Sequence, residues 1–258
     1  MDLAELFKNL EDKFKPESAV LKDNSEKIMF VGDIHGDLST VRYIEENLGK
    51  YDKIICLGDY IDRGAPDIEV SEEIARLKLD NDNLILLPGN HDACKEVYPK
   101  DWRDKLLRRF FSKGWDINDA YLKAFLAAPI AYRNTRYRVL ALHGFIPVMK
   151  NNNYDIKTWN KANENLGSTE YQILWNDPEL TGDCPGNNER GDGIFVVSNK
   201  DTLAFMKRNR LKIIVRSHKP EINRIFKLED RIVVNIGSAS YYGDKYVYLL
   251  PENKIKKI

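Results

Sequence analysis

The four histidines of this 258-residue chain stand in similar surroundings. His35, His91, His143 and His218 each follow an apolar run and lie beside Gly, Asn or Ser. Histidines used only for packing would not be expected to repeat this context. Because imidazole binds metals and transfers protons near neutral pH, the repeated context predicts a functional site built at the ends of strands.

The stretch 58–64 contains the densest group of reactive side chains. Asp59, Asp62 and Arg63 offer two carboxylates and a guanidinium within five residues, and a glycine stands at each end. Glycine lets the backbone turn tightly. The preceding run, 53–57, has the apolar character of a buried strand. We therefore expect these residues at the C-terminal end of a central strand, where open α/β sheets place their ligand sites.

The expected strand ends also supply a set of possible metal ligands. They are oxygen and nitrogen donors without a thiolate: Asp33, His35, Asp59, Asn90, His143 and His218. Such a set suits Mn²⁺, Fe or Zn²⁺ better than a soft metal or a site for Mg²⁺ alone. Six donors exceed the needs of one tetrahedral ion but fit two ions that share Asp59. Paired ions about 3.5–4 Å apart can clamp a phosphoryl group and form hydroxide at neutral pH.

Three further side chains fit chemistry on a phosphate ester. Arg63 is a bidentate partner for phosphate oxygens. His91 follows an expected ligand and could protonate a leaving oxygen, while Asp62 accepts a hydrogen bond from its other nitrogen. Each of these residues alone has an ordinary alternative, as a turn residue, a satisfied core group or a surface ion pair. Their combination favours a site.

The first third of the chain predicts alternating strands and helices. Each expected strand ends in a polar cluster, so three such ends should lie side by side. The expected strands are 27–31, 53–57 and 84–87, the expected helices between them are 38–48 and 65–77, and an amphipathic helix at 3–14 precedes them.

The rest of the chain is expected to add a helical layer and a second sheet. Residues 98–125 are helical in pattern and rich in aromatic residues, which favours a cap over one side of the sheet; a role in shaping the substrate site is the alternative. The other expected elements are a hairpin at 130–142, surface loops at 151–167 and 181–193, a helix at 198–209, and strands at 211–215, 224–228, 231–236 and 246–250. We expect the second sheet to be mostly antiparallel. The predicted fold class is α/β, with a central mixed β-sandwich flanked by helices in a single domain, 1–258.

The composition limits the classes of partner. Hydrophobic residues make up 43% and charged residues 31%, which is typical of a globular protein with a well-solvated surface. The net charge is +0, so no electrostatic footprint for nucleic acid is expected. The N-terminal residues lack the layout of a signal peptide, no apolar run reaches the ~20 residues of a membrane helix, and the three cysteines show no CxxC spacing. These features predict a cytoplasmic protein that does not enter membranes.

The motifs at 32–36, 58–64 and 89–91 together resemble the phosphoesterase motif of the calcineurin-like metallophosphoesterases. More narrowly, the chain resembles the PPP family of Ser/Thr protein phosphatases. That narrower resemblance rests on 174–178, on 190–191 and on 216–218, which occur in the order of that family, with 238–243 as a looser counterpart of its tyrosine-bearing loop.

The resemblance implies a role for each site residue. Asp33, His35 and Asp59 would hold one divalent ion, and Asp59, Asn90, His143 and His218 the other, with manganese favoured over iron or zinc. His91 would be the general acid, supported by Asp62. Phosphate would be bound by Arg63, Arg190, and Tyr241 or Tyr242. The family fold is a four-layer β-sandwich flanked by helices, and the implied reaction is direct attack of a metal-bridging hydroxide on phosphorus, without a phosphoenzyme.

Some residues depart from the protein-phosphatase pattern. Asp92 stands where the family has Glu after the Asn-His pair, Pro88 where it has Arg, and Phe145 where it has a second glycine. None of these departures removes an expected ligand, so they bear on the substrate and not on hydrolysis. We expect a compact, prokaryotic-type phosphatase that acts on phosphoserine and phosphothreonine proteins and is not expected to need a regulatory subunit.

Two other functions remain open from the sequence. A symmetrical dinucleoside tetraphosphatase is similar in the first three motifs, and the aromatic stretch 102–125 could supply a pocket for adenine. A metal-bound interaction module without activity is the non-enzymatic alternative. Loss of a metal ligand or of the general acid would favour this alternative, but the sequence contains all of these residues.

Overall fold

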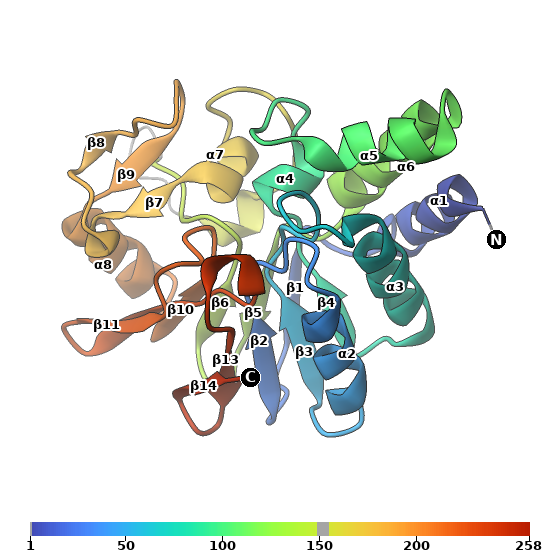
Figure 1. Cartoon of the computed structure of the whole chain (residues 1–258). Coiled ribbons are helices and arrows are strands. Elements are labelled where there is room, and N and C mark those ends of the chain that lie inside the picture. The colour runs from blue at the N-terminus through green and yellow to red at the C-terminus, as the bar shows by residue number, and fades with distance from the viewer. Residues whose placement is uncertain (1, 149–154) are drawn as a thin grey trace.

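Two β-sheets packed against each other occupy the centre of the molecule, and helices cover their outer faces (Figure 1). The structure is a computed structural model that describes residues 2–148 and 155–258. Side chains from both sheets, such as Phe30, Ile55, Val139 and Val215, form one buried cluster between them. The predicted fold class, a mixed α/β sandwich flanked by helices, is therefore confirmed.

The five-stranded sheet has the predicted alternation of strands and helices. Its order is β14-β13-β2-β3-β4, and β2, β3 and β4 are parallel. The strands β13 and β14 are antiparallel to their neighbours, and β14 was not predicted from the sequence. The bounds are β2 Ile28–Val31, α2 Leu38–Asn47, β3 Lys53–Cys56, α3 Asp67–Asp80, β4 Leu84–Leu86, β13 Tyr246–Leu250 and β14 Lys254–Lys257.

The six-stranded sheet has the order β1-β5-β6-β10-β12-β11. The predicted hairpin is present as the antiparallel pair β5 and β6. The prediction of a mostly antiparallel sheet is wrong, because β1 with β5, β6 with β10, and β10 with β12 are parallel pairs. A short apolar run carries no signal for strand direction; the long, helix-containing connection from β6 to β10 permits a parallel pair. The bounds are β1 Val20–Asp23, β5 Ala131–Asn134, β6 Val139–Ala141, β10 Ile213–Arg216, β11 Arg224–Leu228 and β12 Arg231–Asn235.

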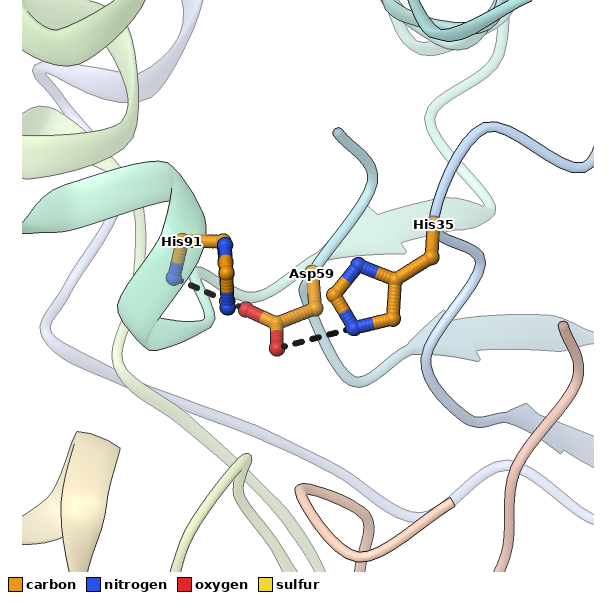
Figure 2. Close-up of side chains that lie close together, drawn as sticks. All are labelled: His35, Asp59 and His91. Carbon is orange, nitrogen blue, oxygen red and sulfur yellow. Dashed lines mark hydrogen bonds and ion pairs between the residues drawn. The ribbon is translucent and has the colours of Figure 1, made fainter. Parts of the chain in front are cut away.

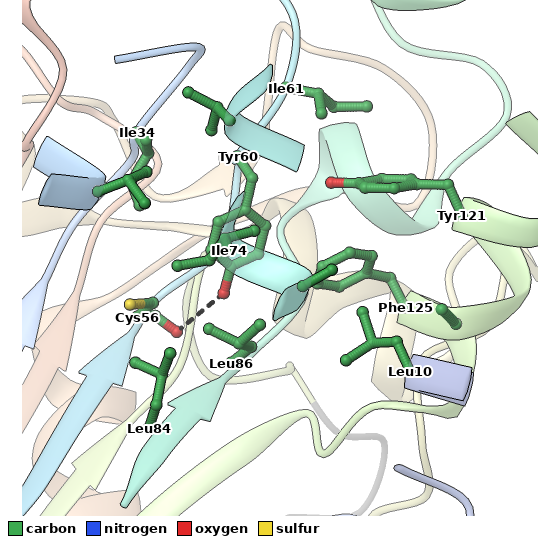
Figure 3. Close-up of a cluster of buried hydrophobic side chains, with 14 of the residues drawn as sticks. Leu10, Ile34, Cys56, Tyr60, Ile61, Ile74, Leu84, Leu86, Tyr121 and Phe125 are labelled. Atoms are coloured by element: carbon green, nitrogen blue, oxygen red, sulfur yellow. Dashed lines mark hydrogen bonds between the residues drawn. The ribbon is translucent and has the colours of Figure 1, made fainter. Parts of the chain in front are cut away.

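The aromatic-rich stretch folds as two helices, α5 (Asp101–Phe110) and α6 (Lys113–Ala127). They pack with α1 (Leu3–Phe14) over the outer face of the five-stranded sheet. The predicted helical cap over one side of a sheet is therefore confirmed. Figure 3 shows Tyr121 and Phe125 of this layer beside Tyr60, which comes from the loop after β3. The hydroxyl of Tyr60 donates to the carbonyl of Leu87, 2.9 Å away. The helical layer thus supports the loop that carries Asp59.

The other outer face is covered by α7 (Thr169–Trp175) and α8 (Asn199–Arg208). The helix α8 confirms the predicted helix at 198–209, and Ser198 caps it by accepting from the backbone N–H of Asp201. The predicted surface loop 151–167 lies partly outside the described residues, at 151–154. Its described part, 155–167, is a loop apart from one 3₁₀ turn, Ile156–Thr158, but it is not wholly at the surface, because Ile156 and Trp159 are buried. Anchoring by a few apolar side chains leaves no periodic signal.

The predicted loop 181–193 belongs mainly to an irregular segment beside a small third sheet. The strand β8 (Gly186–Asn187) pairs with β9 (Phe195–Val197), which also pairs with β7 (Asp177–Pro178). Of the helices in the described part of the chain, none is both long and apolar enough to cross a bilayer.

Candidate metal centre

Asp59 lies at the centre of a buried group of histidines at the C-terminal ends of the strands. Its Oδ2 atom is 3.5 Å from His35 Nε2 and 3.4 Å from His143 Nε2. Its Oδ1 atom accepts from the backbone N–H of His91 at 2.9 Å. Figure 2 shows His35 and His91 on either side of this carboxylate. Asp59 therefore joins two groups of donors, as its central position in the sequence predicts.

The first group consists of Asp33, His35 and Asp59. His35 Nδ1 lies 2.8 Å from the carbonyl oxygen of Ile61, and since a carbonyl can only accept, Nδ1 carries the proton. His35 Nε2 then presents a lone pair toward Asp59 and toward Asp33 Oδ2, 3.8 Å away. Within the described residues this buried nitrogen has no hydrogen-bond partner. A lone pair facing two carboxylates fits a cation between them.

The second group consists of Asp59, Asn90, His143 and His218. The carbonyl of Leu57 accepts from His143 Nδ1 at 2.9 Å, which leaves a lone pair on Nε2. That lone pair faces Asn90 Oδ1 at 3.0 Å and His218 Nδ1 at 3.2 Å. Several acceptors without a proton between them repel one another unless a cation is bound. The lone pairs of these oxygen and nitrogen atoms are metal donors, so this second group fits a bound cation.

The six predicted ligands are thus brought together, and each is at most 5% exposed. Two sets of donor atoms, those of His35, Asp59 and His91 and those of Asp59, His143 and His218, each lie within 4.8 Å of one another. Nitrogen and oxygen donors that share a carboxylate suit two borderline or hard divalent ions. The residues present therefore fit a pair of divalent cations.

The electrostatics of the centre favour the metal-binding protonation states of His35, His218 and Asp59, but not of His143. Burial lowers the pKa of His35 and of His218, which keeps both imidazoles neutral. Burial alone would raise the pKa of Asp59, but the neighbouring imidazoles outweigh it and hold the pKa well below the usual range. Burial also disfavours protonated His143, but the carboxylates of Asp59 and Asp33 outweigh burial and raise its pKa. An ionised carboxylate beside neutral imidazoles is the combination that metals require.

The backbone of the site is unusual in conformation. His35, Asp59, Asp62, Arg63 and His218 have φ values of 41°, 55°, 65°, 69° and 68°. Residues other than glycine rarely adopt this left-handed region, and at functional sites it persists only where the surroundings enforce it.

Close backbone contacts enforce this geometry. A Cβ on Gly89 would lie 2.1 Å from Asp59 Oδ1, and a Cβ on Gly64 would lie 2.1 Å from the carbonyl oxygen of His35. Neither position has room for a side chain, so these glycines let the ligand loops approach one another. This explains the glycines that surround the reactive residues in the sequence.

Asp92 is a site residue whose role was missed from the sequence. Its carboxylate accepts from the backbone N–H groups of Asp59, Tyr60 and Gly89 at 2.6, 3.1 and 2.9 Å. It also accepts from the hydroxyl of Tyr121 on α6 at 2.7 Å. Burial, with the charge of Asp59, raises the pKa of this carboxyl to about 7. Asp92 ties two ligand loops together, and its place after Asn90 and His91 was the available signal.

His91 lies between a carboxylate and a guanidinium. Asp62 Oδ2 accepts from His91 Nδ1 at 2.7 Å, and Arg63 Nη2 lies 3.3 Å from His91 Nε2. The guanidinium of Arg63 also lies 5.5 Å from the centroid of the Tyr242 ring, and that ring is 5.9 Å from the His35 ring. The arrangement places a proton-transfer group and a cationic group next to the centre.

The two tyrosines of the C-terminal loop differ in position. Tyr242 is next to Arg63 and His35, whereas Tyr241 is 63% exposed and contacts the Tyr242 ring at 5.0 Å. The hydroxyl of Tyr242 is buried and has no hydrogen-bond partner among the described residues. Tyr242 is therefore the tyrosine that faces the centre.

Arg190 lies on another side of the centre, in the loop beside the third sheet. Its Nε atom donates to Asp177 Oδ2 at 3.1 Å, and the buried Arg216 donates to Asp177 Oδ1 at 2.9 Å. A cavity of about 560 Å³ has Asp177, Arg190 and Lys219 among its lining residues. Asp177 and Arg216 are in motifs noticed in the sequence, but no role had been assigned to either.

Comparison with known proteins identifies the family. Residues 26–221 match the family described as Calcineurin-like phosphoesterase. Serine/threonine-protein phosphatase 7 of Arabidopsis thaliana is 27% identical over 235 residues, covering 76% of this chain and 56% of the relative. Serine/threonine-protein phosphatase BSL2 of the same plant is 25% identical over 259 residues, covering 93% of this chain and 25% of the relative. The chain thus spans only a quarter to about half of the length of these curated relatives.

Solved structures share the fold. A Saccharomyces cerevisiae protein serine/threonine phosphatase with similarity to human phosphatase PP5 has a TM-score of 0.77 at 19% identity, covering 99% of this chain and 88% of that one. A candidate diadenosine tetraphosphatase has a TM-score of 0.54 at 13% identity, covering 94% of this chain and 98% of that one. Because the family match covers most of the chain, and the centre has the donors described above, this protein belongs to the calcineurin-like phosphoesterases.

Proposed function

We propose that this protein is a metal-dependent phosphomonoesterase that removes phosphate from phosphoserine and phosphothreonine in proteins. The observation that carries the proposal is the placement of His91. Its backbone N–H binds Asp59, and its ring lies between Asp62 and Arg63. A proton donor and a phosphate-binding cation are thus held beside a site for two cations. Relatives named as serine/threonine-protein phosphatases support the choice of substrate.

The proposed ligands divide into two groups with Asp59 in common. Asp33, His35 and Asp59 hold one ion, and Asp59, Asn90, His143 and His218 hold the other. We propose manganese, with iron and zinc as the alternatives to be tested. When bound, such a pair polarises the phosphoryl group and lowers the pKa of water. The protein supplies buried donors and a fixed spacing between them.

The proposed role of His91 is to protonate the oxygen that leaves with the serine or threonine. Asp62 accepts from Nδ1, so Nε2 is the nitrogen that would transfer the proton. It carries one only when the ring is an imidazolium, whose charge Asp62 balances, and it then donates to the substrate oxygen and no longer accepts from Arg63. A general acid must lie within hydrogen-bond reach of the oxygen it protonates. A phosphate held by Arg63 would bring its ester oxygen into that range.

Arg63 and Arg190 are the proposed phosphate-binding cations, with Tyr242 and Tyr241 as further substrate contacts. The buried hydroxyl of Tyr242 is available to a phosphate oxygen. Tyr241, which is exposed, is suited to the part of the peptide around the phosphoresidue. Since the ligands come from both sheets, we propose that the chain acts as a single catalytic domain.

A symmetrical dinucleoside tetraphosphatase is the second candidate, supported by the fold shared with a candidate enzyme of that kind. That function requires a surface for adenine. Trp102, Tyr121 and Phe125 of the aromatic stretch are at most 1% exposed and belong to the core. These three rings are unavailable for stacking on a base, so an adenine contact from this stretch would have to use the exposed rings of Phe111 and Trp115.

The test compares the two substrates on one protein preparation. The protein is stripped with a chelator, restored with Mn²⁺, and assayed with a phosphoserine peptide and with diadenosine tetraphosphate at matched concentration. The variant His91→Asn serves as the control for contaminating phosphatases. Faster turnover of the peptide supports the proposal, and faster turnover of the dinucleotide supports the second candidate. Inactivity on both, with metal bound, would favour an interaction module.

A further inference from the structure

The N-terminal half of α5 is bound to the loop that carries Asp62 and Arg63. The backbone N–H of Trp102 donates to Asp62 Oδ1 at 2.9 Å, and the backbone N–H of Arg63 donates to Asp101 Oδ1 at 3.0 Å. The ammonium group of Lys105 donates to the carbonyl of Gly64 at 2.7 Å. Three consecutive loop residues are thus each bound by this helix.

Lys105 links these contacts to one another. Besides Gly64, its ammonium group binds Asp67 Oδ2 at 2.8 Å and Asp101 Oδ2 at 3.0 Å. A lysine ammonium has three donors, so all three are in use. Asp101 in turn uses one oxygen for Lys105 and the other for the N–H of Arg63. The lysine therefore fixes both the loop and the carboxylate that holds the loop.

The loop needs such support because of its conformation. Asp62 and Arg63 have φ values of 65° and 69°, a region that L-residues avoid. Conformations of this kind persist when the surroundings determine them. Trp102 anchors the helix, since it is 1% exposed and its ring lies 4.5 Å from that of Tyr121.

We propose that Asp101 and Lys105 are positioning residues for phosphate binding and proton transfer. They hold residues 62–64 so that the Arg63 guanidinium and the Asp62–His91 pair face the centre. Their side chains act through the backbone of the loop and do not touch the substrate. This inference rests on the proposed function, because it assigns phosphate binding to Arg63.

The principal test is Lys105→Met, with Arg109→Met as the matched control. Arg109 is on the same helix and also joins it to α3, through Glu69 at 2.6 Å, but has no contact with 62–64 among those described. Lys105→Met should weaken binding of inorganic phosphate to the manganese-loaded protein about tenfold by calorimetry, since small displacements of a binding group are costly. Bound manganese should be unchanged, and Arg109→Met should bind phosphate like the wild type.

A double-mutant cycle separates positioning from general destabilisation. If Lys105 acts through Arg63, Lys105→Met should weaken phosphate binding less than about twofold when Arg63→Ala is already present. An equal loss in both backgrounds would overturn the proposal. The KM for the phosphoserine peptide should follow the same pattern.

A second pair of variants protects the test against loss of folding. Asp101 is partly exposed, and Asp101→Ala removes the acceptor for the N–H of Arg63. Asp101→Asn retains an oxygen acceptor and should restore much of the phosphate binding. Normal phosphate binding in both Lys105→Met and Asp101→Ala would overturn the inference. If the wild type binds phosphate but does not hydrolyse the peptide, the proposed function fails, while the loss in Lys105→Met would still support positioning.

Discussion

The two arginines proposed to bind phosphate are held in opposite ways. Arg63 is in a loop that α5 binds at three consecutive residues, and its backbone is left-handed. Among the described residues it has no carboxylate within ion-pair distance; its guanidinium contacts His91 and Tyr242. Arg190 is in an irregular loop, beside a cavity of about 560 Å³, and its side chain is paired with Asp177.

The two arginines therefore differ in whether their charge is free: Arg63 is held in place without a carboxylate partner among the described residues, whereas Arg190 forms an ion pair. The charge of Arg63 is available to a phosphate, and its position is determined before a substrate arrives. The charge of Arg190 is already shared with Asp177, so its contribution to phosphate binding should be smaller. We therefore expect the Arg63 side, which comprises Asp62, Arg63, His91 and Tyr242, to dominate catalysis.

The largest effect is expected for His91→Asn. Loss of a positioned acid should lower kcat by roughly 10²–10⁴ while bound manganese is unchanged. The loss should be smaller for an aryl phosphate, because its leaving oxygen needs less protonation. A near-normal rate of His91→Asn on an alkyl phosphate would show that His91 is not the proton donor. The Arg63 side would then no longer be expected to dominate catalysis.

The next largest effect is on stability and concerns Asp67, which accepts from the same Lys105 ammonium group that binds the carbonyl of Gly64. Burial raises the pKa of this carboxyl from 3.8 to about 6, although Lys105 opposes the shift. Between these values the folded protein retains a proton that the unfolded chain has released. The free energy of unfolding should therefore fall by up to about 3 kcal/mol as the pH rises through this window.

Urea unfolding at about pH 5 and about pH 7.5 should record roughly half of this loss, about 1.4 kcal/mol, because the carboxyl of the unfolded chain is already ionised at pH 5. The difference in unfolding free energy between the wild type and Asp67→Asn isolates the contribution of Asp67 from that of the other ionisable groups. The wild type should lose more stability than the variant as the pH rises. Equal losses in the wild type and in Asp67→Asn would show that ionised Asp67 does not destabilise the folded protein.

A direct comparison of Arg63→Ala with Arg190→Ala comes next. Hydrogen bonds to charged groups contribute about 1.5–3 kcal/mol, so Arg63→Ala should raise the inhibition constant of phosphate about 10–100-fold. Arg190→Ala should raise it less than about tenfold, since Asp177 remains paired with Arg216. Larger losses at Arg190 would reverse the comparison.

The smallest effect is expected at the tyrosines. Tyr242→Phe should raise the KM for a phosphopeptide about two- to tenfold, because one neutral hydrogen bond is worth about 0.5–1.5 kcal/mol. Tyr241→Phe changes an exposed side chain and should leave KM within about twofold. Equal effects of the two changes would show that both hydroxyls bind the substrate.

The parts of the site that could be predicted from sequence are those encoded locally. Asp59, Asn90 and His143 each follow an apolar run, and the carboxyl ends of neighbouring strands must meet at one edge of the sheet. The bonds from Asp101 and Lys105 to the loop connect residues 38 and 41 positions apart, and no local pattern announces them. Strand direction in the second sheet was mispredicted for the same reason, since it depends on crossovers and not on the strands.

Two details required coordinates because the sequence offers equal alternatives. Tyr241 and Tyr242 are adjacent and chemically identical, and only the turn of Ser240–Tyr242 determines which ring faces Arg63. Asp92 is one methylene shorter than the Glu of the protein-phosphatase pattern at this position. Its function, accepting three backbone N–H groups and a tyrosine hydroxyl, follows from the loops around it.

The left-handed backbone at Arg63 has a consequence for evolution under different selections. Glycine adopts this conformation without the cost of about 1–2 kcal/mol that an L-side chain carries. A library selected only for resistance to heat should therefore accumulate glycine at position 63 and lose turnover. A library selected for turnover should retain arginine and recover its stability elsewhere in the chain. The two libraries would diverge at this residue while keeping the same fold.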